Sequence, residues 1–208
     1  MSDQRETGDG EPPAANSPGQ IPPLVHFAVE PLRHVRLITD AGRAIGLWRY
    51  EVLALPRGAH GDWIVDYGGH SAVLEYFDQD FRQNCNRDVS AAIRIYDPTT
   101  ACNCHGWIFT SGQFGISDSD VPAILTDNGY HAVNAPLDGD LAVYWTDDHP
   151  AHSGIVRIPL SKEVRLIESK WGPFGVYLHS PTVHPFRGDC RFYRTTRSGH
   201  ANIIVSTG

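Results

Sequence analysis

Long hydrophobic runs are missing from this sequence of 208 residues, and so is an excess of positive charge. No apolar stretch approaches the roughly 20 residues that a membrane-spanning helix requires, so we expect no membrane partner. No apolar segment follows a basic start, which predicts a cytoplasmic protein without a secretory signal; export by a signal-independent route is the alternative. The formal net charge of −7 argues against nucleic-acid partners, because general nucleic-acid binding requires a basic face that displaces counterions.

Cysteine is also scarce. The sequence contains Cys85, Cys102, Cys104 and Cys190. In an oxidising compartment these residues could form two disulfides. Without a secretory signal we predict free thiols in a reducing cytoplasm.

The composition changes along the chain. Residues 1–23 are rich in glycine and proline and contain almost no large apolar side chain. Such a segment buries too little surface to offset the entropy lost on ordering, which predicts a disordered tail.

Residues 24–96 are predicted to form a β-rich N-terminal extension. Strand-like runs over 35–39 and 45–53 flank Asp40-Ala41-Gly42, a turn signal that predicts a hairpin. A shorter strand is expected over 63–67 and a short helix over 72–81.

Residues 97–208 are predicted to form the main unit. Ser119 is a capping residue and Pro122 an early-turn proline, and together they predict a short helix that Asn128-Gly129 closes. Strand-like runs follow over 140–145, 153–158, 164–168, 176–178, 191–194 and 203–205. A helix followed by an antiparallel sheet predicts the α+β class.

Three residues suggest thiol chemistry. Cys104 precedes an apolar, helix-like run, and a helix N-terminus favours the thiolate that acts as a nucleophile. His152 opens a β-branched run and is the candidate general base. Glu168 ends the next strand-like run, where a carboxylate could orient the imidazole. His105 and His149 are rival histidines, but His105 directly follows Cys104 on the expected helix, so its side chain should point elsewhere and it is not the expected base.

The motifs around these residues resemble a known family. The segments 103–107, 139–144, 152–156 and 167–172 look like the corresponding motifs of the NlpC and CHAP branches of papain-like cysteine peptidases. In that family a cysteine begins a helix that packs on an antiparallel sheet, and a Gly-Asp strand precedes the strand that starts with the catalytic histidine.

The resemblance implies a papain-like core over 97–208 and a cysteine peptidase or amidase. It implies Cys104 as nucleophile, His152 as base and Glu168 as acidic orienter. The substrate would be a peptide or a peptidoglycan-like amide, and no cofactor is implied. Asn103, Tyr96 and Trp171 are the candidate substrate-binding residues.

Two other interpretations stay open. Lys170 stands where CHAP-like members tend to have Asn, a departure that keeps open a papain-like binding module without catalytic activity. Cys102-x-Cys104-His105, with Cys190 or another histidine, could instead hold a structural zinc ion through sulfur and nitrogen.

Overall fold

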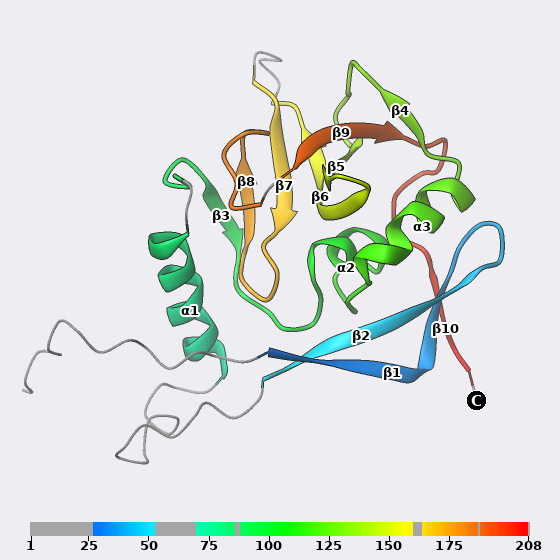
Figure 1. Cartoon of the computed structure of the whole chain (residues 1–208), viewed down its shortest axis with the longest axis horizontal. Coiled ribbons are helices and arrows are strands. Elements are labelled where there is room, and N and C mark those ends of the chain that lie inside the picture. The colour runs from blue at the N-terminus through cyan, green and yellow to red at the C-terminus, as the bar shows by residue number, and fades with distance from the viewer. Residues whose placement is uncertain (1–26, 53–69, 86–87, 160–163, 187, 208) are drawn as a thin grey trace, which may run out of the picture.

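The computed structural model describes residues 27–52, 70–85, 88–159, 164–186 and 188–207. These residues form two antiparallel sheets, a three-stranded sheet in the order β10-β1-β2 and a seven-stranded sheet in the order β3-β8-β7-β6-β5-β9-β4 (Figure 1). The described part of the chain is therefore a mixed α/β structure rich in strands, as the predicted α+β class requires. The predicted tail over 1–23 and the predicted strand over 63–67 lie outside the described residues.

The small sheet confirms the predicted hairpin. β1 (Phe27–Ile38) pairs with β2 (Ala44–Val52), and Gly42 occupies the turn with a φ of +82°. That left-handed conformation favours glycine, which explains the turn signal at this point of the sequence. The third strand, β10 (Ile203–Ser206), pairs with β1 and brings the C-terminal part of the chain to the hairpin.

The large sheet contains most of the strands expected from the second half of the sequence. Its central strands β5 (Leu141–Thr146), β6 (His149–Arg157) and β7 (Leu166–Lys170) follow one another along the chain and pair as neighbours. The others are β3 (Ile93–Tyr96), β4 (His131–Val133), β8 (Val176–His179) and β9 (Asp189–Arg194).

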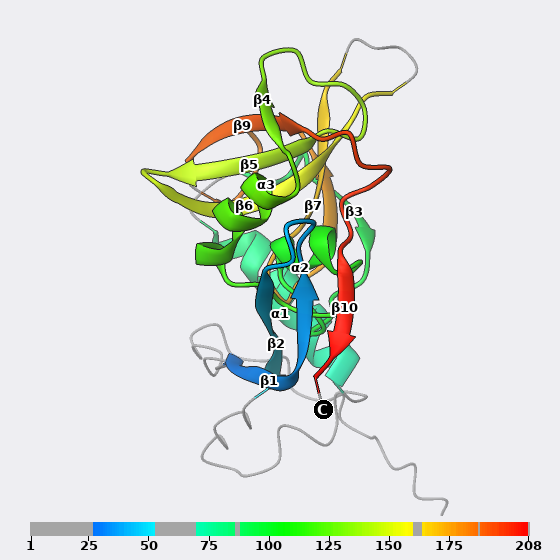
Figure 2. The ribbon, with the colours of Figure 1, turned by 90° about the vertical axis from the view of Figure 1, so that its right-hand side faces the viewer.

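Two short helices lie between the sheets. α2 (Cys104–Phe109) and α3 (Val121–Asp127) pack against the small sheet on one side and against the large sheet on the other (Figure 2). Their apolar side chains share one buried cluster with Leu37 and Ile45 of the hairpin and with Leu141 and Val143 of β5. This shared core explains why the hairpin packs onto the main unit.

The opposite face of the large sheet is covered in part by α1 (His70–Asn84), which is longer than the helix expected over 72–81. Asp78 of α1 accepts hydrogen bonds from the Gly175 amide at 2.9 Å and from the Tyr177 hydroxyl of β8. Phe81 stacks on Phe174 with ring centroids 4.7 Å apart. Among the described residues, no helix is long and apolar enough to cross a membrane.

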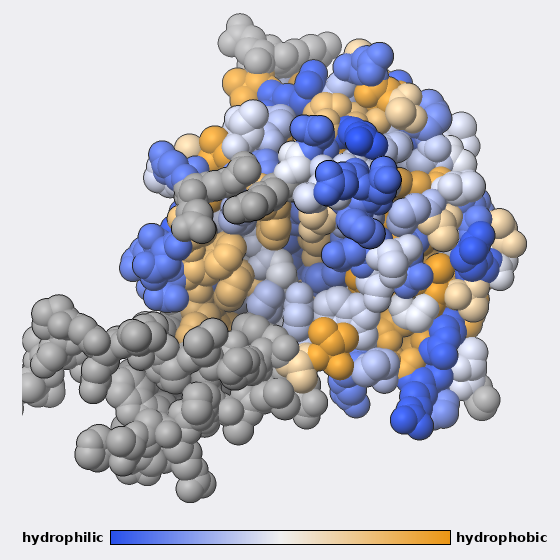
Figure 3. Space-filling view, in the orientation of Figure 1, coloured by the Kyte–Doolittle hydropathy of each residue, from blue (hydrophilic) through white to orange (hydrophobic). Residues whose placement is uncertain are grey.

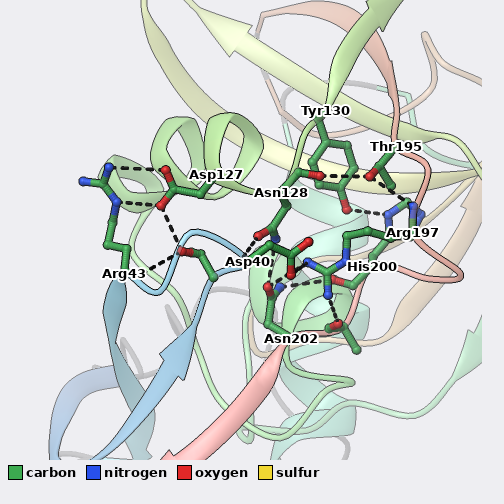
Figure 4. A network of polar contacts seen from close by, with 11 residues as sticks. Asp40, Arg43, Asp127, Asn128, Tyr130, Thr195, Arg197, His200 and Asn202 are labelled. Carbon is green, nitrogen blue, oxygen red and sulfur yellow. Dashed lines mark hydrogen bonds and ion pairs between the residues drawn. The ribbon is translucent and has the colours of Figure 1, made fainter.

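A polar network joins the hairpin to α3 and to the C-terminal segment (Figure 4). The Asn128 side chain, after α3, accepts from the Asp40 amide at 2.8 Å and donates to Asn202 Oδ1 at 2.8 Å. Arg197 forms an ion pair with Asp40 at 3.1 Å. The network therefore connects three segments that are far apart in the sequence.

Candidate functional site

The first turn of α2 is built by Asn103. Its side-chain oxygen accepts from the Gly106 amide at 3.0 Å and from the Ile116 amide at 3.2 Å, and its Nδ2 donates to the Ile116 carbonyl at 2.8 Å. Asn103, a substrate-binding candidate from the sequence, thus caps the helix and joins it to the loop at Ile116. Cys104 is the first residue of the helix, and 6% of its surface is exposed.

His105 is buried beside Cys104 and makes polar contacts at both ring nitrogens. Nδ1 lies 2.8 Å from the Ser153 hydroxyl, and Nε2 lies 3.1 Å from the Pro150 carbonyl oxygen and 3.1 Å from Asp118 Oδ1. A carbonyl and a carboxylate oxygen only accept, so Nε2 carries a proton. Asp118 belongs to the short 3-10 helix η1 (Asp118–Asp120) that precedes α3.

The electrostatics of this group favour a protonated His105. Burial lowers the pKa of His105, but the charge of Cys104 and the hydrogen bonds with Asp118 and Cys104 outweigh burial and raise the pKa to about 10. The structure therefore places the His105 imidazole on the residue after Cys104, with the Asp118 carboxylate 3.1 Å from Nε2. This triple arrangement of Cys104, His105 and Asp118 is called the α2 site below.

Three further ionisable groups interact with the α2 site. Lys170 of β7 is buried and donates from Nζ to the Phe174 carbonyl at 2.6 Å. Burial lowers its pKa to about 8, against the opposing charges of Cys102, Cys104 and Asp78. Burial raises the pKa of the Cys102 thiol to about 11. The pKa of the Tyr50 hydroxyl is also raised, mainly by burial and then by negative charge on Cys104 and Cys102.

His152 lies on the other face of the large sheet. In the β5–β6 register it stands opposite Tyr144, whose side chain packs with Ala142, Val156 and Ile167 on the face away from α2. Its neighbour Ser153 points the other way and contacts His105. Because successive side chains of a strand alternate between faces, β6 brings Ser153 and not His152 to the α2 site.

The surroundings of His152 are aromatic. Its ring is fully buried and stacks on Phe186 at a centroid distance of 3.7 Å. Among the described residues, neither of its ring nitrogens has a hydrogen-bond partner. Burial, followed by the positive charges of His179, His105 and His184, lowers the pKa of His152 well below its ordinary value. His152 is therefore held neutral.

Glu168 and Trp171 lie on opposite faces of the large sheet. Glu168 shares the face of β7 that carries Lys170 and forms an ion pair with Arg157 at 2.9 Å. It stands opposite Ile155 and does not orient His152. Trp171 is buried on the far face, where it stacks on Tyr177 at a centroid distance of 3.9 Å.

Tyr96 is exposed at the edge of the large sheet and packs on Trp107 of α2 with ring centroids 5.5 Å apart. Ile93 is 62% exposed on the same edge strand. Apolar surface gathers in this region, beside α1 (Figure 3). Of the three substrate-binding candidates, Tyr96 is therefore the one at the surface.

Asp118 was not recognised from the sequence. It precedes the capping Ser119, and no local periodicity directs it toward His105, so only the tertiary structure reveals the contact. His105 was present in the sequence as a rival histidine. Its position directly after Cys104 on the helix argued against it from the sequence, and its contacts with Ser153 and Asp118 are tertiary.

The zinc interpretation finds no support in the described residues. No three His, Cys, Asp or Glu side chains among them are arranged to hold a metal ion. Cys190, the proposed fourth ligand, packs with Tyr144 and Ala142 on the face away from α2. The sheet therefore separates it from Cys102 and Cys104.

Two cavities lie elsewhere on the molecule. One of about 420 Å³ is lined by residues of α1 and the loop after it, including Arg82 and Val89. Another of about 300 Å³ is lined by Asp140, Arg194 and His200, among others. Neither includes Cys104 or His152.

No family model, curated protein or solved structure matches this chain, so the likeness to the NlpC and CHAP peptidases rests on the sequence motifs alone.

Proposed function

We propose that this protein is a cysteine-dependent amide hydrolase in which Cys104 is the nucleophile and His105 exchanges protons with it. The observation that carries the proposal is the α2 site: a fully buried imidazole on the residue after Cys104, with Nε2 3.1 Å from Asp118 Oδ1 and a raised pKa. Titratable groups whose pKa values are strongly shifted concentrate at functional sites. A cysteine with only a packing role would not need this arrangement.

In this proposal the roles follow from the contacts. The Cys104 thiolate attacks the amide carbonyl, and the thiol proton resides on His105. His105 then protonates the leaving amine, and water hydrolyses the thioester that remains on Cys104. Asp118 holds the imidazole in place and stabilises its positive charge, as an orienting carboxylate does. Lys170 is close enough to attract a negative charge on Cys104.

The order of elements supports the papain-like interpretation of the core. A helix that begins with a cysteine packs on the antiparallel strands β5, β6 and β7, and Gly139-Asp140 leads into β5. On the strength of the motif resemblance we infer a peptide or peptidoglycan-like amide as substrate. The proposed base and orienting residue differ from those that the family motifs imply. In this proposal the base is His105 and not His152, and the orienting carboxylate is Asp118 and not Glu168.

The test is the rate of iodoacetamide alkylation at each cysteine of the folded protein, followed between pH 5 and 9 by peptide mass spectrometry. We expect Cys104 to react faster than the half-buried Cys85 and Cys190 at neutral pH. His105→Gln should slow alkylation of Cys104 by about tenfold or more, because it removes the cation beside the thiolate. His152→Phe, on the other face of the sheet, is the matched control and should change that rate little.

Two results would contradict the proposal in different ways. If His152→Phe slows the reaction and His105→Gln does not, the base is the histidine that the family motif indicates. If Cys104 stays unreactive across the whole pH range, the protein is not a thiol hydrolase.

A non-catalytic binding module is the second candidate. The observation in its favour is that only 6% of the Cys104 surface is exposed. In that case the α2 site would be a buried polar cluster that holds α2 against the sheet. Unreactive Cys104 together with a strong loss of stability in His105→Gln would support this candidate.

A further inference from the structure

The cavity of about 420 Å³ is lined by two short parts of the chain, the end of α1 and residues 88–90. On α1, Arg82 and Gln83 follow Gln79 by three and four positions, so the three side chains share one face of the helix. Cavities that bind small molecules have volumes of about 300–1,000 Å³. This cavity is therefore large enough for a small ligand, and it does not include Cys104.

The guanidinium of Arg82 is held in place without a counter-ion. Its Nη2 donates to the Ala92 carbonyl at 3.2 Å, and its Cζ lies 5.3 Å from the centre of the Tyr177 ring. Among the described residues, no carboxylate forms an ion pair with Arg82. Asp78, one turn earlier on α1, pairs instead with Arg94 at 3.3 Å. The positive charge of Arg82 is therefore available to an anionic group in the cavity.

The hydrogen-bonding capacity of Arg82 is also largely unused. A guanidinium has five N–H donors in a fixed fork. Within the described structure its Nε is buried without a hydrogen-bond partner, so a ligand in the cavity would meet the Nη atoms. Those atoms suit a carboxylate, which accepts charge-assisted hydrogen bonds from a guanidinium.

Asp88 contributes the opposite charge to the same cavity. Its Oδ1 accepts from the Ser90 amide at 2.9 Å, and hydrogen bonds from the Ser90 side chain and amide hold the pKa of Asp88 below its ordinary value. The carboxylate is therefore ionised at neutral pH. In the described part of the chain, Arg82 and Asp88 do not form an ion pair with each other, although both line the cavity.

Val89 contributes an apolar wall. Its side chain is 3% exposed and packs in a buried cluster with Ala92, Trp171 and Tyr177. The cavity thus combines one positive group, one negative group and a small apolar surface. A ligand that matches all three carries both charges and an apolar side chain.

We propose that this cavity binds a free α-amino acid, whose carboxylate pairs with Arg82 and whose ammonium group pairs with Asp88. A ligand with only a negative charge would be repelled by Asp88, and one with only a positive charge would be repelled by Arg82. The two charges together therefore select a zwitterion over either single ion. Because the cavity is separate from the α2 site, this binding does not depend on the proposed hydrolase function.

The test is isothermal titration calorimetry of the full chain at pH 7 with three matched probes. L-leucine carries both charges, N-acetyl-L-leucine carries only the carboxylate, and L-leucinamide carries only the ammonium group. We expect L-leucine to bind, and each of the other two to bind about tenfold or more weakly, because each lacks one charge-assisted contact.

Two variants locate the binding. Arg82→Met keeps an alkyl chain beside Tyr177 but removes the guanidinium, and Asp88→Asn keeps an oxygen for the Ser90 amide but removes the charge. Each should weaken binding of L-leucine by about tenfold or more. If Arg82→Met does not fold, Asp88→Asn still tests the site, because Asp88 is exposed.

The matched controls are Arg33→Met, at an exposed position of β1, and Asp148→Asn, at an exposed turn, and both should bind L-leucine as the wild type does. The proposal is overturned if L-leucine does not bind at millimolar concentrations. It is also overturned if N-acetyl-L-leucine binds as tightly as L-leucine, since that result shows a site for simple anions. Unchanged affinity in both site variants would show that L-leucine binds elsewhere, which also contradicts the proposal.

Discussion

Two adjacent residues of β6 point to opposite faces of the large sheet. Ser153 faces α2 and contacts His105, whereas His152 faces the aromatic cluster on the other side of the sheet. The motif resemblance predicts Cys104 as nucleophile and His152 as base, and those roles remain predictions. It could not reveal the face on which each side chain lies, because a shift of one residue in strand register exchanges the two faces.

Replacing Asp118 by Asn should lower the pKa of His105, because the substitution removes the carboxylate 3.1 Å from Nε2. The raised pKa in the folded state means that protonated His105 stabilises the fold below pH 6.5, and that this contribution is lost as the pH rises through about 10. NMR titration of the His105 Cε1–H resonance measures the pKa directly. Asp148→Asn, an exposed change, is the control, and an unshifted midpoint in Asp118→Asn would contradict the assigned ion pair.

At the scale of elements, α2 depends on a close approach of backbone to backbone. A Cβ atom on Gly106 would lie 1.8 Å from the Phe114 carbonyl oxygen, so any side chain there must displace the chain. We expect Gly106→Ala to lower the free energy of unfolding by about 3 kcal/mol or more, at or beyond the upper end of overpacking effects.

Gly46→Ala is the matched control for this effect. A Cβ atom on Gly46, in β2, would meet no atom within 4 Å. The free energy of unfolding of the Gly46→Ala variant should therefore change by less than about 0.5 kcal/mol. Urea unfolding of both variants measures the difference. Equal stability of the two variants would show that α2 is free to move away from Phe114.

Local elements were more predictable than their pairing. The hairpin follows from the turn residues Asp40-Ala41-Gly42, and the start of α3 follows from Pro122, since both depend on chemistry within a few residues. The strand expected over 164–168 occurs two residues later, as β7. The pairing of β1 with β10 had no local signal, because it depends on contacts between distant segments.

At the scale of the whole molecule, the network around Asn128 connects the hairpin, α3 and the C-terminal segment. Asn128→Ala would leave the Asp40 amide and Asn202 without this partner at a position that is 3% exposed. We expect a loss of about 1–3 kcal/mol in the free energy of unfolding, measured in urea. Asn84→Ala, at an exposed end of α1, is the control. A loss no larger than that of the control would mean that the network contributes little to stability.

The pairing of β1 with β10 also has a consequence for biosynthesis. Val35 stands opposite Ser206, so the small sheet is complete only when almost all of the described chain has left the ribosome. Until then the outer edge of β1 presents unpaired amide and carbonyl groups, which other chains could recruit. Contacts between such distant segments slow folding, because the intervening loop must close first. We therefore expect β10 to dock late, with the nascent hairpin as the region most in need of a chaperone.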